Sequence, residues 1–288
     1  MKLRDAFKSR KFAITAEIGP GKGTDITEFL HNADLLKDKV DAVNCTDQQS
    51  AVMRVGSLAA CLLLKEKNLQ PILQMTCRDR NRISLQSELL SAAVLGIENV
   101  LCLTGDDVTL GDHPQAKPVF DLDSVSLLYA AKQLEQGKDL AGKELKGTPK
   151  FFLGACSTPC ADPLGPQLMK LEKKIKAGAE FIQTQAVYEP DKFAKFMKEA
   201  SLFGIPIMVG IVLLKSAAMA RFMNKNVAGI NVPDSLISEM DKAEDKGKKG
   251  IEIAARLLNE MKSMCQGAHI MPLGWDAEVP KVIEAAEG

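Results

Sequence analysis

The chain has 288 residues, of which 46% are hydrophobic, and it carries 37 basic and 37 acidic side chains, so its formal net charge is zero. This length is close to that of a (β/α)8 barrel and allows one large core, which predicts a single domain over residues 1–288. Because the charges balance, no global field attracts nucleic acid or an anionic membrane surface, and we expect a small molecule or a protein as partner.

The beginning of the chain carries no sign of export. Residues 1–18 lack the apolar run of a signal peptide, and no later stretch is long and apolar enough to span a bilayer. We therefore expect a cytoplasmic protein. The seven cysteines are odd in number and lack the paired spacing of a disulfide scaffold, so we expect reduced thiols.

Short apolar runs rich in β-branched residues alternate with amphipathic stretches along the chain, a pattern typical of buried parallel strands joined by crossover helices. The predicted strands cover residues 12–18, 42–46, 71–77, 100–105, 151–156, 181–185, 207–213 and 268–273. The predicted helices cover residues 26–37, 50–67, 82–95, 124–136, 164–177, 190–202, 215–225, 232–264 (two helices broken near 246–250) and 277–287. This alternation favours an α/β fold, a single (β/α)8 TIM barrel, with an open doubly wound sheet as the alternative.

In such a barrel, reactive groups lie at the C-terminal ends of the strands. The first predicted strand ends with Glu17, a carboxyl group within an apolar sequence, where desolvation would raise its pKa toward neutrality. It could act as a general acid, or it could pair with a barrel lysine or cap a loop, and these interpretations have equal weight. Other polar residues that end predicted strands are Thr46, Asp47, Gln74 and Thr76.

Two further strand ends carry polar groups. Leu103-Thr104-Gly105-Asp106 places a glycine, which allows close backbone approach, beside a carboxylate that can hydrogen-bond a planar heterocycle, although an ordinary turn is the commoner explanation. On the sixth strand, Gln183 and Gln185 share one face, and an amide can read the edge of a pterin. We expect one of these glutamines to bind a ligand and the other to satisfy polar groups inside the barrel.

Three other features are best explained by structural roles. The basic helix 170–176 is predicted to be a solvated face, although one of its lysines could reach a cofactor phosphate. Met219, Phe222 and Met223 form an apolar helical stripe that is predicted to be core. His269 is predicted to pack inside the barrel.

The ordered set Glu17, Thr46, Leu103-Thr-Gly-Asp106, Lys174-Ile-Lys-Ala-Gly-Ala and Phe181-Ile-Gln-Thr-Gln185 resembles the methylenetetrahydrofolate reductase family, from the first strand to about residue 230. The resemblance implies a barrel with a flavin, usually FAD and less often FMN, across its mouth. It also implies hydride transfer that converts 5,10-methylenetetrahydrofolate into 5-methyltetrahydrofolate.

The resemblance also implies roles for single residues. Glu17 would protonate a folate nitrogen, Asp106 would tune flavin and pterin, and Gln185, or else Gln183, would hydrogen-bond the pterin. The positions that match flavin-contacting residues are Thr46, Gln74, Thr104, Gly105, Asp106 and Lys174.

The chain departs from the family at three positions. Thr104 stands where many relatives carry arginine, Gln74 stands where histidine is familiar, and no aromatic residue follows the seventh strand in residues 209–217. Similar versions from anaerobes that use the folate route of carbon fixation work beside a zinc-binding or iron–sulfur partner subunit, which implies an oligomer. Two alternatives stay open: a pterin-binding barrel methyltransferase, and a non-catalytic barrel subunit of a redox complex.

Overall fold

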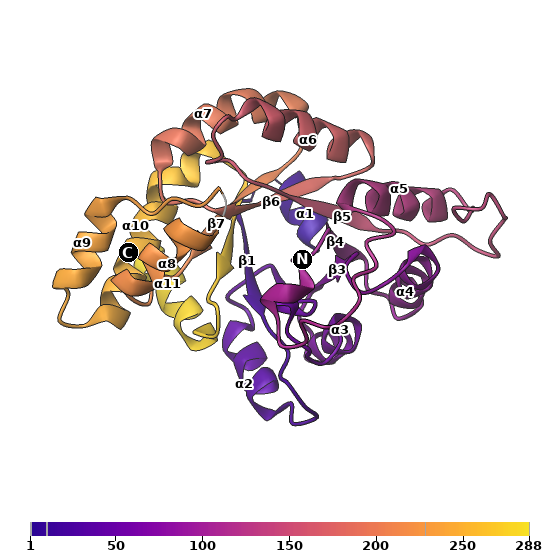
Figure 1. Cartoon of the computed structure of the whole chain (residues 1–288), viewed down its shortest axis with the longest axis horizontal. Coiled ribbons are helices and arrows are strands. Elements are labelled where there is room, and N and C mark those ends of the chain that lie inside the picture. The colour runs from indigo at the N-terminus through magenta and orange to yellow at the C-terminus, as the bar shows by residue number, and fades with distance from the viewer. Residues whose placement is uncertain (1, 10, 228, 288) are drawn as a thin grey trace.

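The strands form a closed parallel barrel in the order β1-β2-β3-β4-β5-β6-β7-β8, and helices surround it (Figure 1). The computed structural model describes residues 2–9, 11–227 and 229–287. The strands are β1 (Ala13–Ile18), β2 (Ala42–Cys45), β3 (Pro71–Thr76), β4 (Asn99–Leu103), β5 (Phe152–Ser157), β6 (Phe181–Ala186), β7 (Ile207–Val212) and β8 (Gly267–Met271). All eight predicted strands are confirmed within two residues, and the open-sheet alternative is wrong because β1 pairs with β8.

The helices also follow the prediction, with three differences. The α-helices are α1 (Leu3–Lys8), α2 (Thr27–Leu36), α3 (Ser57–Glu66), α4 (Arg82–Val94), α5 (Ser124–Glu135), α6 (Gly165–Lys176), α7 (Pro190–Ala200), α8 (Ala217–Asn226), α9 (Asp234–Lys242), α10 (Lys246–Met261) and α11 (Val279–Glu287). The short 3-10 helices are η1 (Gln49–Ala51), η2 (Val108–Leu110), η3 (Ser201–Phe203), η4 (Lys262–Met264) and η5 (Asp276–Glu278).

The three differences have local causes. Helix α1 was not predicted, because six residues before a strand give too little periodicity to recognise. Helix α3 begins at Ser57 instead of residue 50, because the backbone before it enters left-handed conformations. The break between α9 and α10 lies at 243–245, where the Asp245 side chain accepts a hydrogen bond from Lys248 N and begins α10.

The inside of the barrel is divided by polarity. At the N-terminal end of the strands, α1 closes the barrel by burying Leu3 and Ala6 among inward-facing apolar side chains such as Phe152 and Phe181. Toward the C-terminal end, the interior carries polar side chains instead, and a larger apolar layer lies between the strands and the helices. The reactive end of the barrel is therefore the end where inward-facing positions are polar.

The remaining expectations concern cysteines and membranes. No disulfide joins any of the seven cysteines, which all lie in the described residues, and all but Cys156 are buried. None of the helices in the described parts of the chain has the length and apolar character needed to cross a membrane.

Candidate active site

A cavity of about 670 Å³ lies at the C-terminal ends of the strands. The structure brings eight of the nine predicted site residues to its wall: Glu17, Gln74, Thr104, Gly105, Asp106, Lys174, Gln183 and Gln185. The ninth, Thr46, is 1% exposed, lies outside the lining, and its Oγ1 has no hydrogen-bond partner among the described residues. The strand ends therefore collect at one mouth, as the fold rule predicts.

Glu17 lies in the floor of the cavity with 8% of its surface exposed. Gln49 Nε2 donates to its Oε1 at 3.0 Å, and Gln74 Nε2 donates to its Oε2 at 2.9 Å. His269 Nε2 is 3.8 Å from Oε2. No lysine or arginine forms an ion pair with this carboxyl group among the described residues, so the structural alternative of a lysine-paired barrel glutamate is wrong.

A buried hydrogen-bond network lies below Glu17. Gln183 and Asn44 exchange both amide hydrogen bonds, at 2.8 and 3.1 Å, which fixes the orientation of the Gln183 amide. Gln183 Nε2 also donates to Thr15 Oγ1 at 3.1 Å, and that hydroxyl lies 3.0 Å from His269 Nδ1. The hydroxyl can therefore donate to Nδ1, an arrangement in which the neutral ring carries its proton on Nε2, the nitrogen that faces Glu17.

The two glutamines of β6 differ in environment. Gln183 is 1% exposed and bound to other side chains, whereas Gln185 is exposed on the cavity wall. The β6–β7 register shifts between Gln183 and Ala186, and a bulge of this kind re-aims a side chain. Gly210 makes the bulge possible, because a Cβ there would lie 2.2 Å from the Thr184 carbonyl oxygen. Gln183 is therefore buried and hydrogen-bonded to other side chains, whereas Gln185 is accessible to a ligand.

The β4 end presents backbone and a carboxylate. Gly105 has φ +97, and a Cβ there would lie 3.1 Å from side-chain carbons of Thr76 and Arg78, so the position requires glycine. Asp106 is exposed at the cavity. Thr104 also lines the cavity, but its Oγ1 accepts from Ser124 N at 3.2 Å and so supports the beginning of α5.

The opposite wall carries a buried cation. Lys174, on α6, is 8% exposed, and its Nζ donates to the Cys156 carbonyl oxygen at 2.6 Å. Burial lowers the pKa of this ammonium group. Nearby, Ser157 Oγ is buried without a hydrogen-bond partner among the described residues. Among the described residues, this ammonium group has no carboxylate partner and this hydroxyl has no hydrogen-bond partner, so the wall is suited to an anionic or polar ligand.

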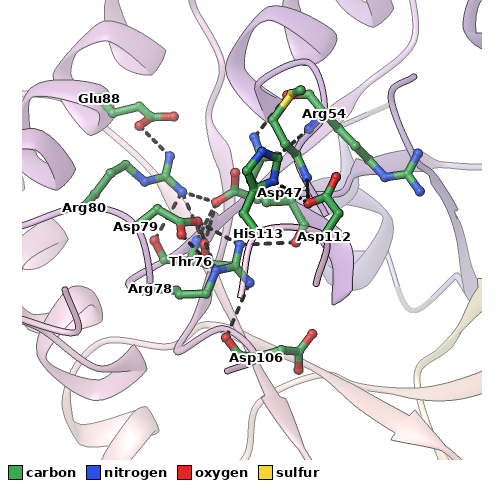
Figure 2. Close-up of polar contacts among 12 residues, drawn as sticks. Asp47, Arg54, Thr76, Arg78, Asp79, Arg80, Glu88, Asp106, Asp112 and His113 are labelled. Atoms are coloured by element: carbon green, nitrogen blue, oxygen red, sulfur yellow. Dashed lines mark hydrogen bonds and ion pairs between the residues drawn. The ribbon is translucent and has the colours of Figure 1, made fainter. Parts of the chain in front are cut away.

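Asp47 and Thr76, which also end predicted strands, belong to a hydrogen-bond network in the cavity wall (Figure 2). Asp47 Oδ2 accepts from Thr76 N at 2.8 Å, from Thr76 Oγ1 at 2.9 Å, and from Arg80 Nη2. Arg80 Nη1 also donates to Glu88 Oε2 at 2.6 Å. These contacts hold the β2 and β3 ends together through Asp47 Oδ2, and both Asp47 and Thr76 line the cavity.

Two residues of the cavity could not be recognised in the sequence. Gln49 was placed next to a predicted helix, where nothing marks it as a partner of Glu17. Phe222 was predicted to be core, which is wrong: it is 62% exposed and lines the cavity together with Met219 and Met223. Helical periodicity identifies an apolar face but cannot tell a core from the apolar side of a pocket.

A closed parallel barrel with its polar side chains collected at the C-terminal mouth is the architecture of a TIM-barrel enzyme. The chain belongs to the methylenetetrahydrofolate reductase family, whose model, described as methylenetetrahydrofolate reductase, matches residues 2–287. This confirms the resemblance seen in the sequence.

Similar curated proteins carry the same description. Over 256 residues the chain is 26% identical to methylenetetrahydrofolate reductase 2 of Schizosaccharomyces pombe, covering 80% of this chain and 38% of that protein. Over 244 residues it is 22% identical to a probable methylenetetrahydrofolate reductase (NADPH) of Caenorhabditis elegans, covering 80% and 34%. The chain therefore spans little more than a third of the length of these relatives.

Among solved structures, a protein from Clostridium thermocellum, described as binding two copies of 5-methyl-5,6,7,8-tetrahydrofolic acid, has the same fold with a TM-score of 0.68. Its sequence is 16% identical, and the match covers 99% of this chain and 98% of that one.

Proposed function

We propose that this protein reduces 5,10-methylenetetrahydrofolate to 5-methyltetrahydrofolate with a flavin, FAD, at the barrel mouth. Family membership and the names of the curated relatives support this reaction. The observation that carries it is the Glu17 carboxyl group, which is buried in the cavity, hydrogen-bonded by two neutral amides and paired with no cation among the described residues. A general acid needs this freedom, because a cation would hold it ionised.

In this proposal Glu17 donates its proton to a folate nitrogen. The bond between that nitrogen and the methylene bridge then breaks, and the bridge becomes an iminium carbon on the other nitrogen. A reduced flavin supplies, when bound, the hydride that turns this carbon into a methyl group. Glu17 ends the step as a carboxylate, which the amide hydrogens of Gln49 and Gln74 stabilise.

Other residues bind and orient the substrate. Gln185 is the glutamine assigned to the pterin, because its side chain is exposed at the cavity whereas that of Gln183 is engaged with Asn44 and Thr15. Gln183 keeps an indirect role, since it orders the network below Glu17. Asp106, exposed at the β4 end, provides a negative charge near the pterin and the flavin.

The residues present fit a flavin. Lys174 offers a buried ammonium group and Ser157 an unused hydroxyl in the same wall, which suits a phosphate or a ribityl chain. Gly105 allows the backbone to approach a flat ring, with Thr104 beside it. Thr46 is too enclosed to touch the ligand, and Gln74 is occupied by Glu17, so these two act by supporting the wall.

The test is spectroscopic and kinetic. Purified protein reconstituted with FAD should absorb as a bound flavin and, once reduced by dithionite, should be reoxidised by 5,10-methylenetetrahydrofolate. Glu17→Gln should keep the flavin spectrum and its reduction but lose reoxidation by the folate by about 100-fold or more. A protein that binds neither FAD nor FMN would refute the proposal.

A second candidate is a pterin-binding barrel that transfers a methyl group without a flavin. The C. thermocellum protein, which is described as binding two copies of 5-methyl-5,6,7,8-tetrahydrofolic acid, supports the idea of a folate in a barrel of this fold. Binding of 5-methyltetrahydrofolate to protein that takes up no flavin would favour this candidate over the reductase.

A further inference from the structure

Resting on the proposed function, we infer that Gln49 is a positioning residue that aims the Glu17 carboxyl group at the substrate, and that the turn after β2 is built to present it. Gln49 Nε2 lies 3.0 Å from Glu17 Oε1, while Gln74 holds the other oxygen. Nothing in the sequence suggests this contact, since the two residues are 32 positions apart.

The backbone around Gln49 adopts conformations that such residues rarely take. Gln48, Ser50 and Ala51 have φ values of 49, 56 and 57, in the left-handed region that disfavours residues with a Cβ. Three such residues in four positions make the turn costly, so tertiary contacts must hold it. Strain of this kind gathers at sites where side-chain placement matters.

Arg78 and Arg54, both labelled in Figure 2, each form a hydrogen bond with Gln48 of the turn. Arg78, with 2% of its side chain exposed, donates through Nη2 to the Gln48 carbonyl oxygen at 3.2 Å and to Asp79 Oδ2 at 2.7 Å. Its Nε also donates to Asp79, and its Nη1 donates to the Asp106 carbonyl oxygen at 3.5 Å. The Gln48 side chain accepts from Arg54 N at 2.7 Å, and Arg54 Nη1 donates to the Pro20 carbonyl oxygen at 3.3 Å.

The β4 loop closes the third side. Asp112 Oδ1 accepts from Met53 N at 3.1 Å, and Asp112 also pairs with Lys22 of the β1 loop. Gly111 packs so closely that a Cβ there would overlap the Ala51 carbonyl oxygen at 1.8 Å. Loops after three strands therefore fix the turn that carries Gln49, one of the two amides that donate to Glu17.

The chemistry explains why this partner is an amide. A carboxyl group that cycles between acid and carboxylate needs a neighbour that serves both states, and an amide donates through its nitrogen or accepts through its oxygen once turned over. With Gln74 alone, one oxygen would be held and the carboxyl plane could rotate. With both, each oxygen has its own partner, and the direction of the transferred proton is set.

Gln49→Met keeps the side-chain length and removes the amide. We expect reoxidation of reduced flavin by the folate to slow by about 10- to 100-fold, while flavin binding and reduction by dithionite stay unchanged. Because a donor to the carboxylate is lost, the pH limb that reports the acid should move to higher pH, and Gln49→Glu should move it further by adding a like charge. Gln115→Met, the same change on an exposed loop residue, should match the wild type. A Gln49→Met protein with the wild-type rate and pH profile would overturn the inference.

A second readout does not depend on turnover. The side-chain amide signal of Gln49, identified in a ¹⁵N spectrum by its loss in Gln49→Met, should shift with pH in the wild type and stop shifting in Glu17→Gln. If the wild type reduces no folate but the Gln49 amide signal still shifts with pH in a way that depends on Glu17, the proposed reaction is wrong and the contact between Gln49 and Glu17 is supported. An amide signal that is indifferent to Glu17→Gln would overturn the positioning role.

Discussion

At the scale of single residues, Lys174 is a buried ammonium group that donates to the carbonyl oxygen of Cys156 and not to a carboxylate. Burial lowers the pKa of this group, and an anionic ligand would offset the desolvation. Lys174→Met should therefore weaken FAD binding by about 10- to 100-fold, the effect of a lost hydrogen bond to a charged group. Titration of FAD by fluorescence quenching measures it, and Lys173→Met, an exposed neighbour on the same helix, should bind normally.

Asp276 gives the chain a testable pH dependence. It is 9% exposed, it accepts a hydrogen bond from Asn32 Nδ2 at 3.2 Å, and burial raises its pKa from 3.8 to about 6. The folded state therefore holds this proton more tightly than the unfolded state, so the free energy of unfolding falls as the pH rises from about 4 to 6.

Asp276→Asn should remove that loss. The variant should be more stable than the wild type at pH 7 by up to about 3 kcal/mol, the equivalent of roughly two pKa units, and nearly equal at pH 4. Urea unfolding at both pH values measures the difference. Glu66→Gln, an exposed change on α3, should leave the pH dependence of stability unchanged. If the stability difference between Asp276→Asn and the wild type were the same at pH 7 as at pH 4, the raised pKa would not belong to Asp276.

At the scale of elements, the β6 bulge depends on Gly210. A Cβ there would lie 2.2 Å from the Thr184 carbonyl oxygen and 2.7 Å from that of Gln185, and backbone atoms cannot yield as a flexible side chain does. Gly210→Ala should cost about 1–3 kcal/mol of unfolding free energy and weaken folate binding, because Gln185 moves with the bulge. Gly165→Ala, where nothing lies within 4 Å of the new Cβ, is the matched control. If Gly210→Ala bound folate with the wild-type affinity, the bulge would not be needed to place Gln185 for binding.

The strands and part of the site could be predicted from the sequence, whereas two cavity residues could not. The strands could be predicted because a buried parallel strand is a continuous apolar run, and Glu17 could be predicted because it interrupts one at the mouth. Gln49 could not, because its position depends on a left-handed turn that Arg78 holds from the loop after β3. Phe222 could not, because an apolar helix face has the same periodicity whether it meets a core or a cavity. Local patterns therefore predict elements, whereas contacts between loops decide the site.

At the scale of the whole molecule, the barrel separates stability from chemistry along its axis. The N-terminal end is closed by α1 and packed with apolar side chains, whereas the inward-facing positions at the C-terminal end carry polar side chains. Polar interiors contribute little net stability, so the apolar end has to support the strained turn and the buried acid above it.

Leu3 tests this division. Its side chain is fully buried where the strands converge, and its backbone N–H donates to Gln70 Oε1 at 2.9 Å. Leu3→Ala should therefore lower the free energy of unfolding by about 2–5 kcal/mol. Because every strand of a closed barrel pairs with two neighbours, circular dichroism and the fluorescence of Trp275, at the other end of the barrel, should report one shared transition. The exposed change Lys8→Ala should have little effect. If Leu3→Ala removed only the helical signal of α1 and left the midpoint of the main unfolding transition unchanged, α1 would not contribute to the stability of the rest of the barrel.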